Sequence, residues 1–261
     1  MRVALISDIH GNATALQAVL ADIRRHPVDL IVCLGDVATL GPQPAQVVEL
    51  LAALRCPCIL GNHEAALFHP DKAAEYRIPP VLLPSLHWCI RQLTPDHLAV
   101  LSACQPTATF PLSPTASLAC FHGSPKSSIG QIVATTSPDE LDRLLAGTAA
   151  NIFAGGHSHF QLLRQHRGNL IVNPGSVGSA FLTPPVGDVA PTLLPWAEYA
   201  VLDWTDNSAS VDFRRVPFDI QGFLEVLEQS DLPMKTWLRE QYMQSQKRPP
   251  AGSGRAPGGE T

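Results

Sequence analysis

Short apolar runs that end abruptly in polar residues and glycine recur along this chain, and they constrain its fold more than any other feature. The first run, residues 3–6, is followed closely by Asp8, His10 and Gly11. Buried parallel strands are continuous apolar runs of this kind, and open α/β sheets carry their sites at the carboxyl ends of such strands. Since Asp8 and His10 are two residues apart, an extended backbone would point both side chains to one side. A carboxylate beside an imidazole predicts half of a transition-metal site.

Two further apolar runs end in the same way, and helical segments separate the three. Residues 29–34 and 58–60 are predicted to be the second and third strands. The polar residues after them are Gly35 and Asp36 in one case, and Gly61, Asn62, His63 and Glu64 in the other. Between the strands, residues 12–25 and 44–54 have apolar residues at helical spacing, with Asn12 as an N-cap. Strands that alternate with helices are typical of α/β folds with a parallel sheet.

The rest of the chain predicts more strands, several of which also end in histidine or asparagine. Residues 69–105 are mainly helical by pattern, and a helix covers 137–147. The predicted strands are two hairpins, 107–112 with 116–121 and 160–165 with 169–172, and a strand over 151–154. The polar residues that follow these strands are His122, Gly123, Gly155, Gly156, His157, His159, Asn173 and Ser176. Strands over 199–204 and 209–215 alternate as half-exposed antiparallel strands do, and helices over 220–227 and 234–242 follow.

The domain organisation is expected to be simple. Neither an internal repeat nor a linker divides the sequence, so we predict a single domain over residues 1–243. From residue 244 to 261, Pro, Gly, Ser, Lys and Arg dominate, which predicts a disordered tail. The proline-rich segment 183–195 is predicted to be a long loop with a functional or mobile role.

Charge and cysteine content narrow the classes of partner and compartment. The formal net charge is −5, which argues against general binding to nucleic acid or anionic membranes. No apolar run is long enough to span a bilayer, and a candidate site that begins at Asp8 leaves no room for a secretory leader. The six cysteines form no C-x-x-C pair and are expected to be reduced, packed thiols. The closely spaced Cys56 and Cys58 could be proposed as ligands or as a redox pair, but the pattern favours entry into a strand. We expect a cytoplasmic protein.

Collected from the predicted strand ends, the polar side chains form a metal-binding set. The set is Asp8, His10, Asp36, Asn62, His63, His122, His157 and His159. Two acids, four of the five imidazoles and an amide oxygen would supply two ions with mixed nitrogen and oxygen ligands, which suit Mn, Fe, Zn or Co better than Ca or Mg alone. Asp36 is the natural bridge between two ions, because its unit lies between the flanking ones.

Five blocks, in this order, resemble the calcineurin-like metallophosphoesterase superfamily. The blocks are Asp8-Ile9-His10, Gly35-Asp36, Gly61-Asn62-His63-Glu64, His122-Gly123 and Gly156-His157-Ser158-His159. Two further stretches, Gly35-Asp36-Val37 with Gly41-Pro42 and Asn173-Pro174-Gly175-Ser176-Val177-Gly178, resemble its small single-domain bacterial and archaeal phosphodiesterase-like branch. The resemblance implies a four-layer αββα sandwich of two mixed β-sheets flanked by helices. It also implies a cofactor of two divalent ions (Mn, Fe, Zn, Ni or Co), with Mn expected in vitro.

Roles for the residues follow from the same resemblance. One ion would be held by Asp8, His10, Asp36 and His159, and the other by Asp36, Asn62, His122 and His157. His63 would contact the phosphate and assist the leaving group as a general acid, with Glu64 orienting it. Asn12 is expected to lie near the metal ligands or the substrate. Asn173 and Ser176 would support the site through hydrogen bonds or would simply form a tight turn.

The function implied is that of a dinuclear-metal hydrolase for a small phosphate ester, with a phosphodiesterase that uses metal-activated hydroxide as the first expectation. The alternatives are a phosphomonoesterase or protein phosphatase, a scaffold that keeps the fold without catalysis, and a nuclease for long DNA. No Asp-Arg-Gly follows Gly35-Asp36, which argues against protein phosphatases. His63 is present, which argues against the scaffold, and the acidic charge argues against the nuclease. The pattern specifies neither the substrate nor an oligomeric state.

Overall fold

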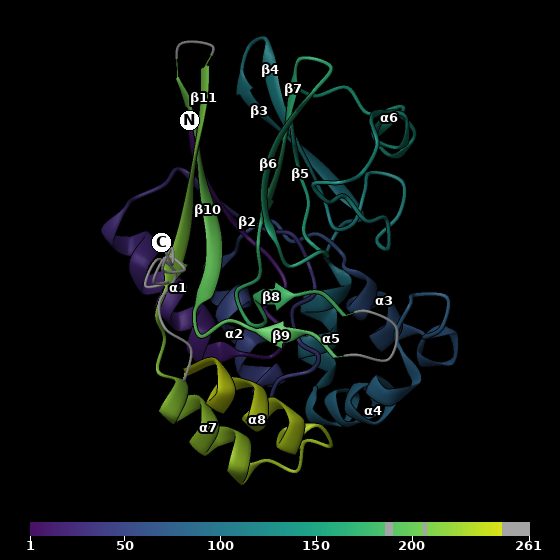
Figure 1. Cartoon of the computed structure of the whole chain (residues 1–261), viewed down its shortest axis with the longest axis vertical. Coiled ribbons are helices and arrows are strands. Elements are labelled where there is room, and N and C mark those ends of the chain that lie inside the picture. The colour runs from purple at the N-terminus through teal and green to yellow at the C-terminus, as the bar shows by residue number, and fades with distance from the viewer. Residues whose placement is uncertain (186–189, 206–207, 247–261) are drawn as a thin grey trace, which may run out of the picture.

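Two mixed β-sheets lie face to face in the computed structural model of the chain, which describes residues 1–185, 190–205 and 208–246 (Figure 1). The first sheet has the order β11 (Ser208–Val216), β10 (Ala197–Thr205), β1 (Arg2–Ile6) and β2 (Leu30–Cys33). The second has the order β3 (Thr107–Ser113), β4 (Ala116–Phe121), β5 (Ile152–Ala154), β7 (Asn169–Pro174) and β6 (Gln161–His166). The strands β1 and β2 are parallel, as are β4, β5 and β7. In each of the two groups of parallel strands, the loops that follow the strands therefore lie at the same edge of the sheet.

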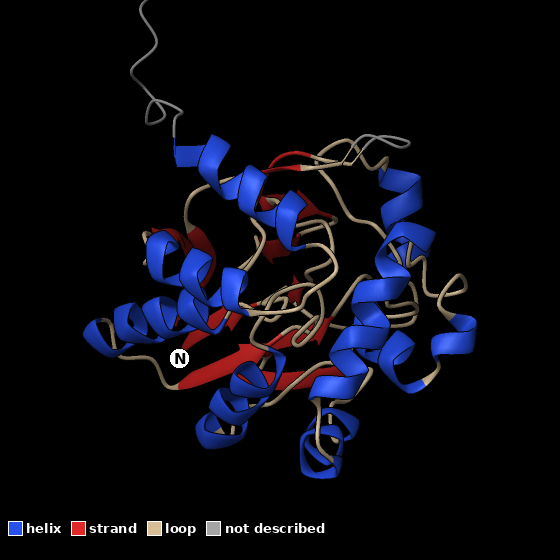
Figure 2. Cartoon of the chain, turned by 90° about the horizontal axis from the view of Figure 1, so that it is seen from below, coloured by secondary structure: helices blue, strands red, loops and turns tan. Residues whose placement is uncertain are grey.

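The helices lie outside the sheets (Figure 2). They are α1 (Ala13–Arg25), α2 (Pro44–Leu54), α3 (Asn62–Phe68), α4 (Leu83–Gln92), α5 (Pro95–Ser102), α6 (Pro138–Leu145), α7 (Ile220–Gln229) and α8 (Lys235–Gln246), with short 3₁₀ turns at Pro70–Lys72 and Pro80–Leu82. Within the described ranges, no helix has the length and apolar character needed to cross a bilayer.

Three hydrophobic cores explain why the apolar runs are continuous. In β1, Val3 and Leu5 pack between the two sheets, while Ala4 and Ile6 face the helices. The second sheet has the same alternation: Leu118 of β4 points between the sheets, and Phe121 packs beneath α6. Because both faces of each sheet are covered, both sets of alternating residues are apolar. The predicted αββα sandwich is confirmed.

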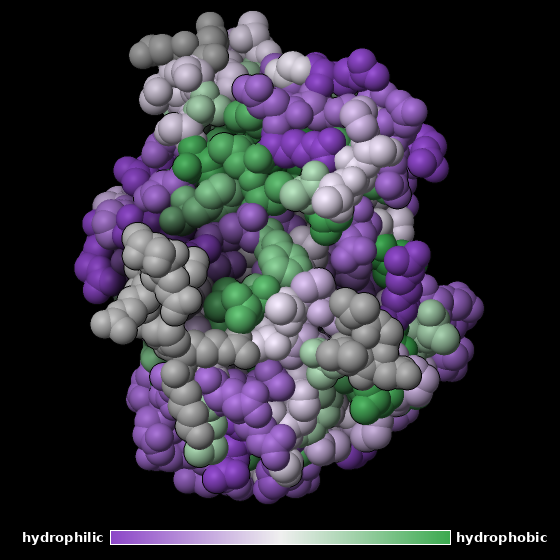
Figure 3. Space-filling model, viewed as in Figure 1, coloured by the Kyte–Doolittle hydropathy of each residue, from purple (hydrophilic) through white to green (hydrophobic). Residues whose placement is uncertain are grey.

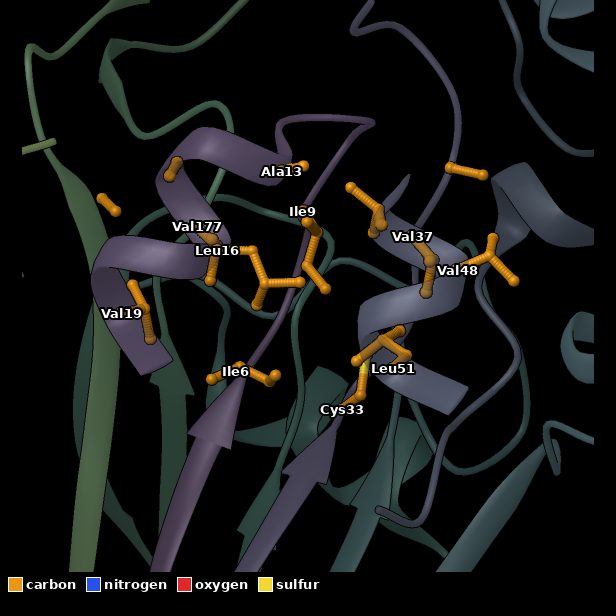
Figure 4. Close-up of a cluster of buried hydrophobic side chains, with 14 of the residues drawn as sticks. Ile6, Ile9, Ala13, Leu16, Val19, Cys33, Val37, Val48, Leu51 and Val177 are labelled. Atoms are coloured by element: carbon orange, nitrogen blue, oxygen red, sulfur yellow. The ribbon is translucent and has the colours of Figure 1, made fainter. Parts of the chain in front are cut away.

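The core on the helical side of the first sheet joins it to α1 and α2. Figure 4 shows Ile6 and Cys33, from the ends of β1 and β2, beneath Leu16 of α1 and Leu51 of α2. Burying side chains of this size stabilises the fold by about 1.5–3 kcal/mol each. On the front face, apolar residues gather where the β10–β11 pair approaches β6 (Figure 3).

Several expected elements differ from those observed. The strand β10 is not half-exposed: Ala197–Leu202 is buried because one face packs on the helices and the other between the sheets. Its edge neighbour β11 is half-exposed, as predicted. Residues 58–60 make only isolated bridges, from Cys58 to Cys33 and from Ile59 to Gln105, instead of a full strand.

The two segments expected to be irregular are also partly ordered. The predicted long loop 183–195 contains the ends of a small antiparallel pair, β8 (Phe181–Thr183) and β9 (Thr192–Leu193), while 186–189 lies outside the described residues. The helix α8 continues to Gln246, three residues into the expected tail, because Tyr242 and Ser245 are buried on its inner face. Residues 247–261 lie outside the described part of the chain. The single domain over 1–243 stays a prediction.

A buried carboxylate ties α1 to the edge of the first sheet. Asp22 accepts hydrogen bonds from the Tyr199 hydroxyl at 2.7 Å and from Arg214 at 3.1 Å, and Arg25 donates a third at 2.9 Å. Burial would raise the pKa of Asp22, but the hydrogen bonds from Arg25, Tyr199 and Arg214 outweigh it and lower the pKa to about 2. The ionised form of Asp22 therefore stabilises the folded state.

Replacing Asp22 with asparagine is expected to lower the free energy of unfolding by about 2 kcal/mol at pH 7, since one pKa unit corresponds to about 1.4 kcal/mol. The folded-state pKa of Asp22, about 2, lies below the ordinary value of 3.8. The stabilisation by the ionised carboxylate is therefore complete above pH 3.8, and it is lost as the pH falls through the folded-state pKa. Urea unfolding should show a smaller difference in the free energy of unfolding between wild type and Asp22→Asn at pH 3 than at pH 7. Asp212, which also binds Arg214 but is 54% exposed, provides the control. Asp212→Asn should cost less than about 1 kcal/mol.

Candidate metal centre

The strand-end side chains singled out in the sequence converge on one site. Asp8 and His10 follow β1, Asp36 follows β2, and His122 follows β4. His157 and His159 follow β5, and Asn62 and His63 form the first turn of α3. All are buried except His157, which is partly exposed.

The backbone that carries these side chains is not extended, contrary to our expectation for Asp8 and His10. The strand β1 ends at Ile6, and Asp8 (φ 53°) and His10 (φ 48°) both adopt the left-handed conformation, as do Asp36, His157 and His159. The loop after β1 stays attached to the loop after β2, with Asp8 N donating to Gly35 O and His10 N to Asp36 O. Left-handed backbone costs about 1–2 kcal/mol per residue, so the surrounding bonds must hold these turns in place.

One group of ligand atoms is formed by Asp8, His10 and His159. The Nε2 atom of His159 lies 3.2 Å from Oδ1 of Asp8 and 3.2 Å from Nε2 of His10. The Nε2 atom of His10 lies 3.9 Å from Oδ1 of Asp8. Two imidazole nitrogens and one carboxylate oxygen thus face a common point.

A second group is formed by Asp36, His122 and His157. The Nε2 atom of His122 lies 3.2 Å from Oδ2 of Asp36 and 3.1 Å from Oδ1 of Asn62, which adds the amide oxygen to the group. The same Oδ2 of Asp36 is 3.8 Å from Nε2 of His10. Asp36 therefore lies between the two groups, where a shared ligand is needed.

Hydrogen bonds at the far side of two rings set their orientation. The Nδ1 atom of His122 donates to Leu34 O, and that of His159 donates to Ser179 O, each at 2.7 Å. With Nδ1 protonated, the Nε2 atom of each ring would offer a lone pair to an ion that displaces the Nε2 proton. A carbonyl partner on the second nitrogen is the usual arrangement for histidines that bind metals.

Burial and the charges of neighbouring acids and imidazoles shift the pKa values of the site residues. Burial would raise the pKa of Asp8, but nearby His159 lowers it to about 2. Burial would lower the pKa of His122, but the Asp36 charge raises it to about 10. By contrast, burial and His159 lower the pKa of His10 to about 3, and burial also lowers the pKa of His63. The acids are therefore ionised at neutral pH.

The residues fit divalent transition-metal ions. Among the described residues, no hydrogen-bond partner is found for the buried Oδ1 atom of Asp8, and buried polar atoms normally have one. Ligands about 2.1 Å from an ion lie roughly 3.0–3.4 Å from one another, and the closest donor pairs in both groups are 3.1–3.2 Å apart. Imidazole and carboxylate donors together suit Zn, Fe, Mn or related ions.

Glu64 joins two of the loops but does not orient the His63 side chain as we expected. Its carboxylate accepts hydrogen bonds from the backbone amides of Asp36, Val37 and Gly61. Burial and the charge of Asp36 raise the pKa of Glu64 to about 7. The side chain that contacts the His63 ring is instead the buried Thr39, which sequence patterns did not single out.

Asn173 and Ser176 support the site through hydrogen bonds, the first of the two alternatives left open by the sequence. The Nδ2 group of Asn173 donates to Gly156 O at 2.6 Å and to Ser158 Oγ at 3.0 Å, which fixes the loop that carries His157 and His159. The Ser176 hydroxyl donates to Asp8 O at 2.7 Å. Both side chains therefore hold in place the loops that carry Asp8, His157 and His159.

Asn12 has a capping role, and it leads to a residue that the sequence did not indicate. Its Oδ1 atom accepts from Ala15 N, as predicted for the N-cap of α1, and its Nδ2 group contacts the Tyr242 hydroxyl at 3.4 Å. Tyr242, on α8, donates to Gly178 O at 2.6 Å, and Gly178 N donates in turn to Asp8 O. The last described helix thus supports the loop that carries Asp8.

Sequence comparison places this site in a known context. A family model described as the calcineurin-like phosphoesterase superfamily domain matches residues 1–190. A curated relative, the uncharacterized protein MJ0912 of Methanocaldococcus jannaschii, is 27% identical over 253 residues, which cover 91% of this chain and 96% of that protein.

Solved structures share the fold. The crystal structure of a metallophosphoesterase from Sphaerobacter thermophilus is 27% identical, with a TM-score of 0.67 over 89% of this chain and 95% of that one. The hypothetical protein PH1004 from Pyrococcus horikoshii OT3 is 18% identical, with a TM-score of 0.74 over 94% of this chain and 97% of that one. Because only 18% of its residues are identical, this second structure shows that the two proteins share a fold and nothing more.

Proposed function

Because the chain belongs to the calcineurin-like phosphoesterase superfamily, we propose that it is a metal-dependent enzyme that hydrolyses a small phosphodiester. The observation that carries this proposal is the pair of ligand groups on either side of Asp36. Two adjacent groups that share a carboxylate favour a dinuclear centre over a single structural ion.

The residues that would hold the ions are the two predicted sets: Asp8, His10, Asp36 and His159 for one, and Asp36, Asn62, His122 and His157 for the other. When bound, such ions neutralise phosphate oxygens and lower the pKa of a coordinated water toward neutrality. We propose Mn, Fe, Zn, Ni or Co, with Mn²⁺ as the ion for assays, because the donors are imidazole and carboxylate groups.

The chain's own residues would position the substrate and assist the departing group. His63 lies beside the site, with its ring 5.0 Å from that of His10 in an edge-on arrangement. Burial lowers the pKa of His63, which favours the neutral form of its ring. The N–H group of a neutral ring can donate a hydrogen bond to the oxygen that leaves and so stabilise the negative charge that develops there.

The segment after Asp36 favours diesters over monoesters. A phosphate monoester carries an average charge of about −1.5 to −2 at neutral pH, whereas a diester carries a single charge. Residues 35–41 contain no Lys or Arg that could balance the extra charge. A phosphomonoesterase or protein phosphatase is therefore the second candidate.

The alternative to an enzyme is a scaffold protein that keeps this fold without catalysing a reaction. The presence of His63 next to the ligand groups is the feature that favours the enzyme, because a scaffold has no need of a histidine there. We also propose a cytoplasmic location, since the structure leaves all six cysteines unpaired, and a small substrate without nucleic acid, in view of the acidic charge.

Addition of Mn²⁺ to the purified protein is expected to produce turnover of bis(p-nitrophenyl) phosphate, with p-nitrophenyl phosphate hydrolysed more slowly. The measurement is the release of p-nitrophenolate before and after treatment with a chelator and readdition of the metal. Absence of turnover with every one of Mn, Ni, Co, Fe and Zn would rule out the enzyme and favour the scaffold. Faster turnover of the monoester would reverse the proposed preference.

A further inference from the structure

Thr39 makes a short hydrogen bond with the proposed catalytic histidine. Its Oγ1 atom lies 2.7 Å from Nδ1 of His63; Thr39 lies in the loop after β2, and His63, 24 positions later, lies in the first turn of α3. Thr39 is fully buried, and His63 is 9% exposed. Water therefore cannot easily replace either partner, which gives this bond more influence on the ring than a surface contact would have.

The loop that carries Thr39 is held on both sides. Before Thr39, the amides of Asp36 and Val37 donate to Glu64, and Ala38 O accepts from the Cys89 thiol. After it, Leu40 adopts a left-handed backbone (φ 79°), which is unfavourable for a residue with a branched side chain. The surroundings hold this loop in one conformation and so fix the place of the Thr39 hydroxyl.

The direction of the hydrogen bond follows from the need to satisfy a buried hydroxyl. Within the described residues, Nδ1 of His63 is the partner found for the Thr39 hydroxyl. A buried O–H group without an acceptor costs about 1–3 kcal/mol, so the hydroxyl proton is best placed toward Nδ1. In a neutral imidazole, one nitrogen accepts and the other carries the proton. The proton of the His63 ring then resides on Nε2, at the opposite edge.

We propose that Thr39 is a positioning residue that holds the neutral His63 ring in one orientation and in the tautomer with the proton on Nε2. A carboxylate at position 39 could only accept a hydrogen bond and would place the ring proton on Nδ1 instead. A hydroxyl can donate, so it leaves Nε2–H as the group offered to a leaving oxygen. The kinetic part of this inference rests on the proposed function, whereas the tautomer itself does not.

The experiment compares Thr39→Val, which has the same shape but no hydroxyl, with Thr39→Ser, which keeps it. With bis(p-nitrophenyl) phosphate and Mn²⁺, we expect Thr39→Val to lower kcat by about 10- to 100-fold with KM little changed, as loss of comparable supporting hydrogen bonds does. Thr39→Ser should recover most of the turnover. Metal content by mass spectrometry and the thermal melting curve should match wild type in both variants.

A second readout is independent of catalysis. Long-range ¹H–¹⁵N NMR spectra of the Zn²⁺-loaded protein distinguish the two neutral tautomers, and the His63 signals can be assigned with His63→Asn. We expect the Nε2–H form in wild type and Thr39→Ser, and loss of that single form in Thr39→Val. A wild-type ring protonated on Nδ1, or equal kcat in Thr39→Val and wild type, would overturn the proposal. An inactive wild type with the Nε2–H form would contradict the proposed function and leave the tautomer assignment supported.

Discussion

His63→Ala is expected to lower turnover of bis(p-nitrophenyl) phosphate by about 10²- to 10⁴-fold while leaving the metal content nearly intact. The size of the loss is that of removing a group that donates to the leaving oxygen in the transition state. Metal should remain because His63 Nδ1 is engaged by Thr39, while the two ligand groups are complete without the ring. The measurements are kcat and KM with Mn²⁺, together with metal content by mass spectrometry after dialysis.

The matched control is His87→Ala, an exposed histidine on α4. It should retain wild-type activity, which would show that the effect belongs to position 63 and not to the loss of any histidine. Loss of metal from His63→Ala would mean that this ring is a ligand. Such a result would agree with the third group of close donor atoms, His10, Asp36 and His63, and would change the proposed role.

Asp36→Asn is expected to reduce the bound metal from two ions to less than one per chain and to lower activity by about 10³-fold or more. Its Oδ2 atom is 3.2 Å from Nε2 of His122 and 3.8 Å from Nε2 of His10, so one carboxylate serves both groups. Loss of its charge weakens both ions, and metal ions supply several kcal/mol of transition-state stabilisation. Asparagine keeps the shape and an oxygen for the amide of His63, so the fold should persist.

Asp8→Asn provides the comparison, because the Asp8 carboxylate meets the side-chain donors of one group, while its Oδ2 atom accepts from the backbone amide of His157 at 3.1 Å. Its Oδ1 atom faces His159 and His10, whereas Asn62, His122 and His157 lie in the other group. Asp8→Asn should therefore retain about one ion per chain after dialysis against the same Mn²⁺ buffer. If Asp36→Asn and Asp8→Asn lost equal amounts of metal, Asp36 would not be a shared ligand.

The convergence of the proposed ligand residues was predictable because the pattern that places them is local. Asp8, Asp36, His122 and His157 each follow a short apolar run that can only be buried, and parallel strands place their carboxyl ends together. The turns themselves were not predictable in detail. Asp8 and His10 reach the same site through left-handed backbone, since their amides bond to the loop after β2.

The supporting contacts could not have been predicted in the same way. Glu64 belongs to the recognisable Gly61–Glu64 block, yet its carboxylate binds the amides of Asp36 and Val37 and leaves the His63 ring to Thr39. No periodicity marks a single threonine in a loop. The half-exposed pattern expected for β10 was also wrong, because coverage of its second face depends on helices from other parts of the chain.

Sequence patterns were sufficient to predict the α/β class, the burial of the short apolar strands and the residues that gather at the strand ends. These properties follow from the spacing of apolar residues and from the donor types of the side chains. Tertiary structure alone decided which distant groups satisfy one another. Tyr242 meets Asn12 from 230 positions away, and Tyr199 meets Asp22 from 177 positions away. A buried hydrogen bond depends on distance in space within a few tenths of an ångström, and no local pattern in the chain encodes that distance.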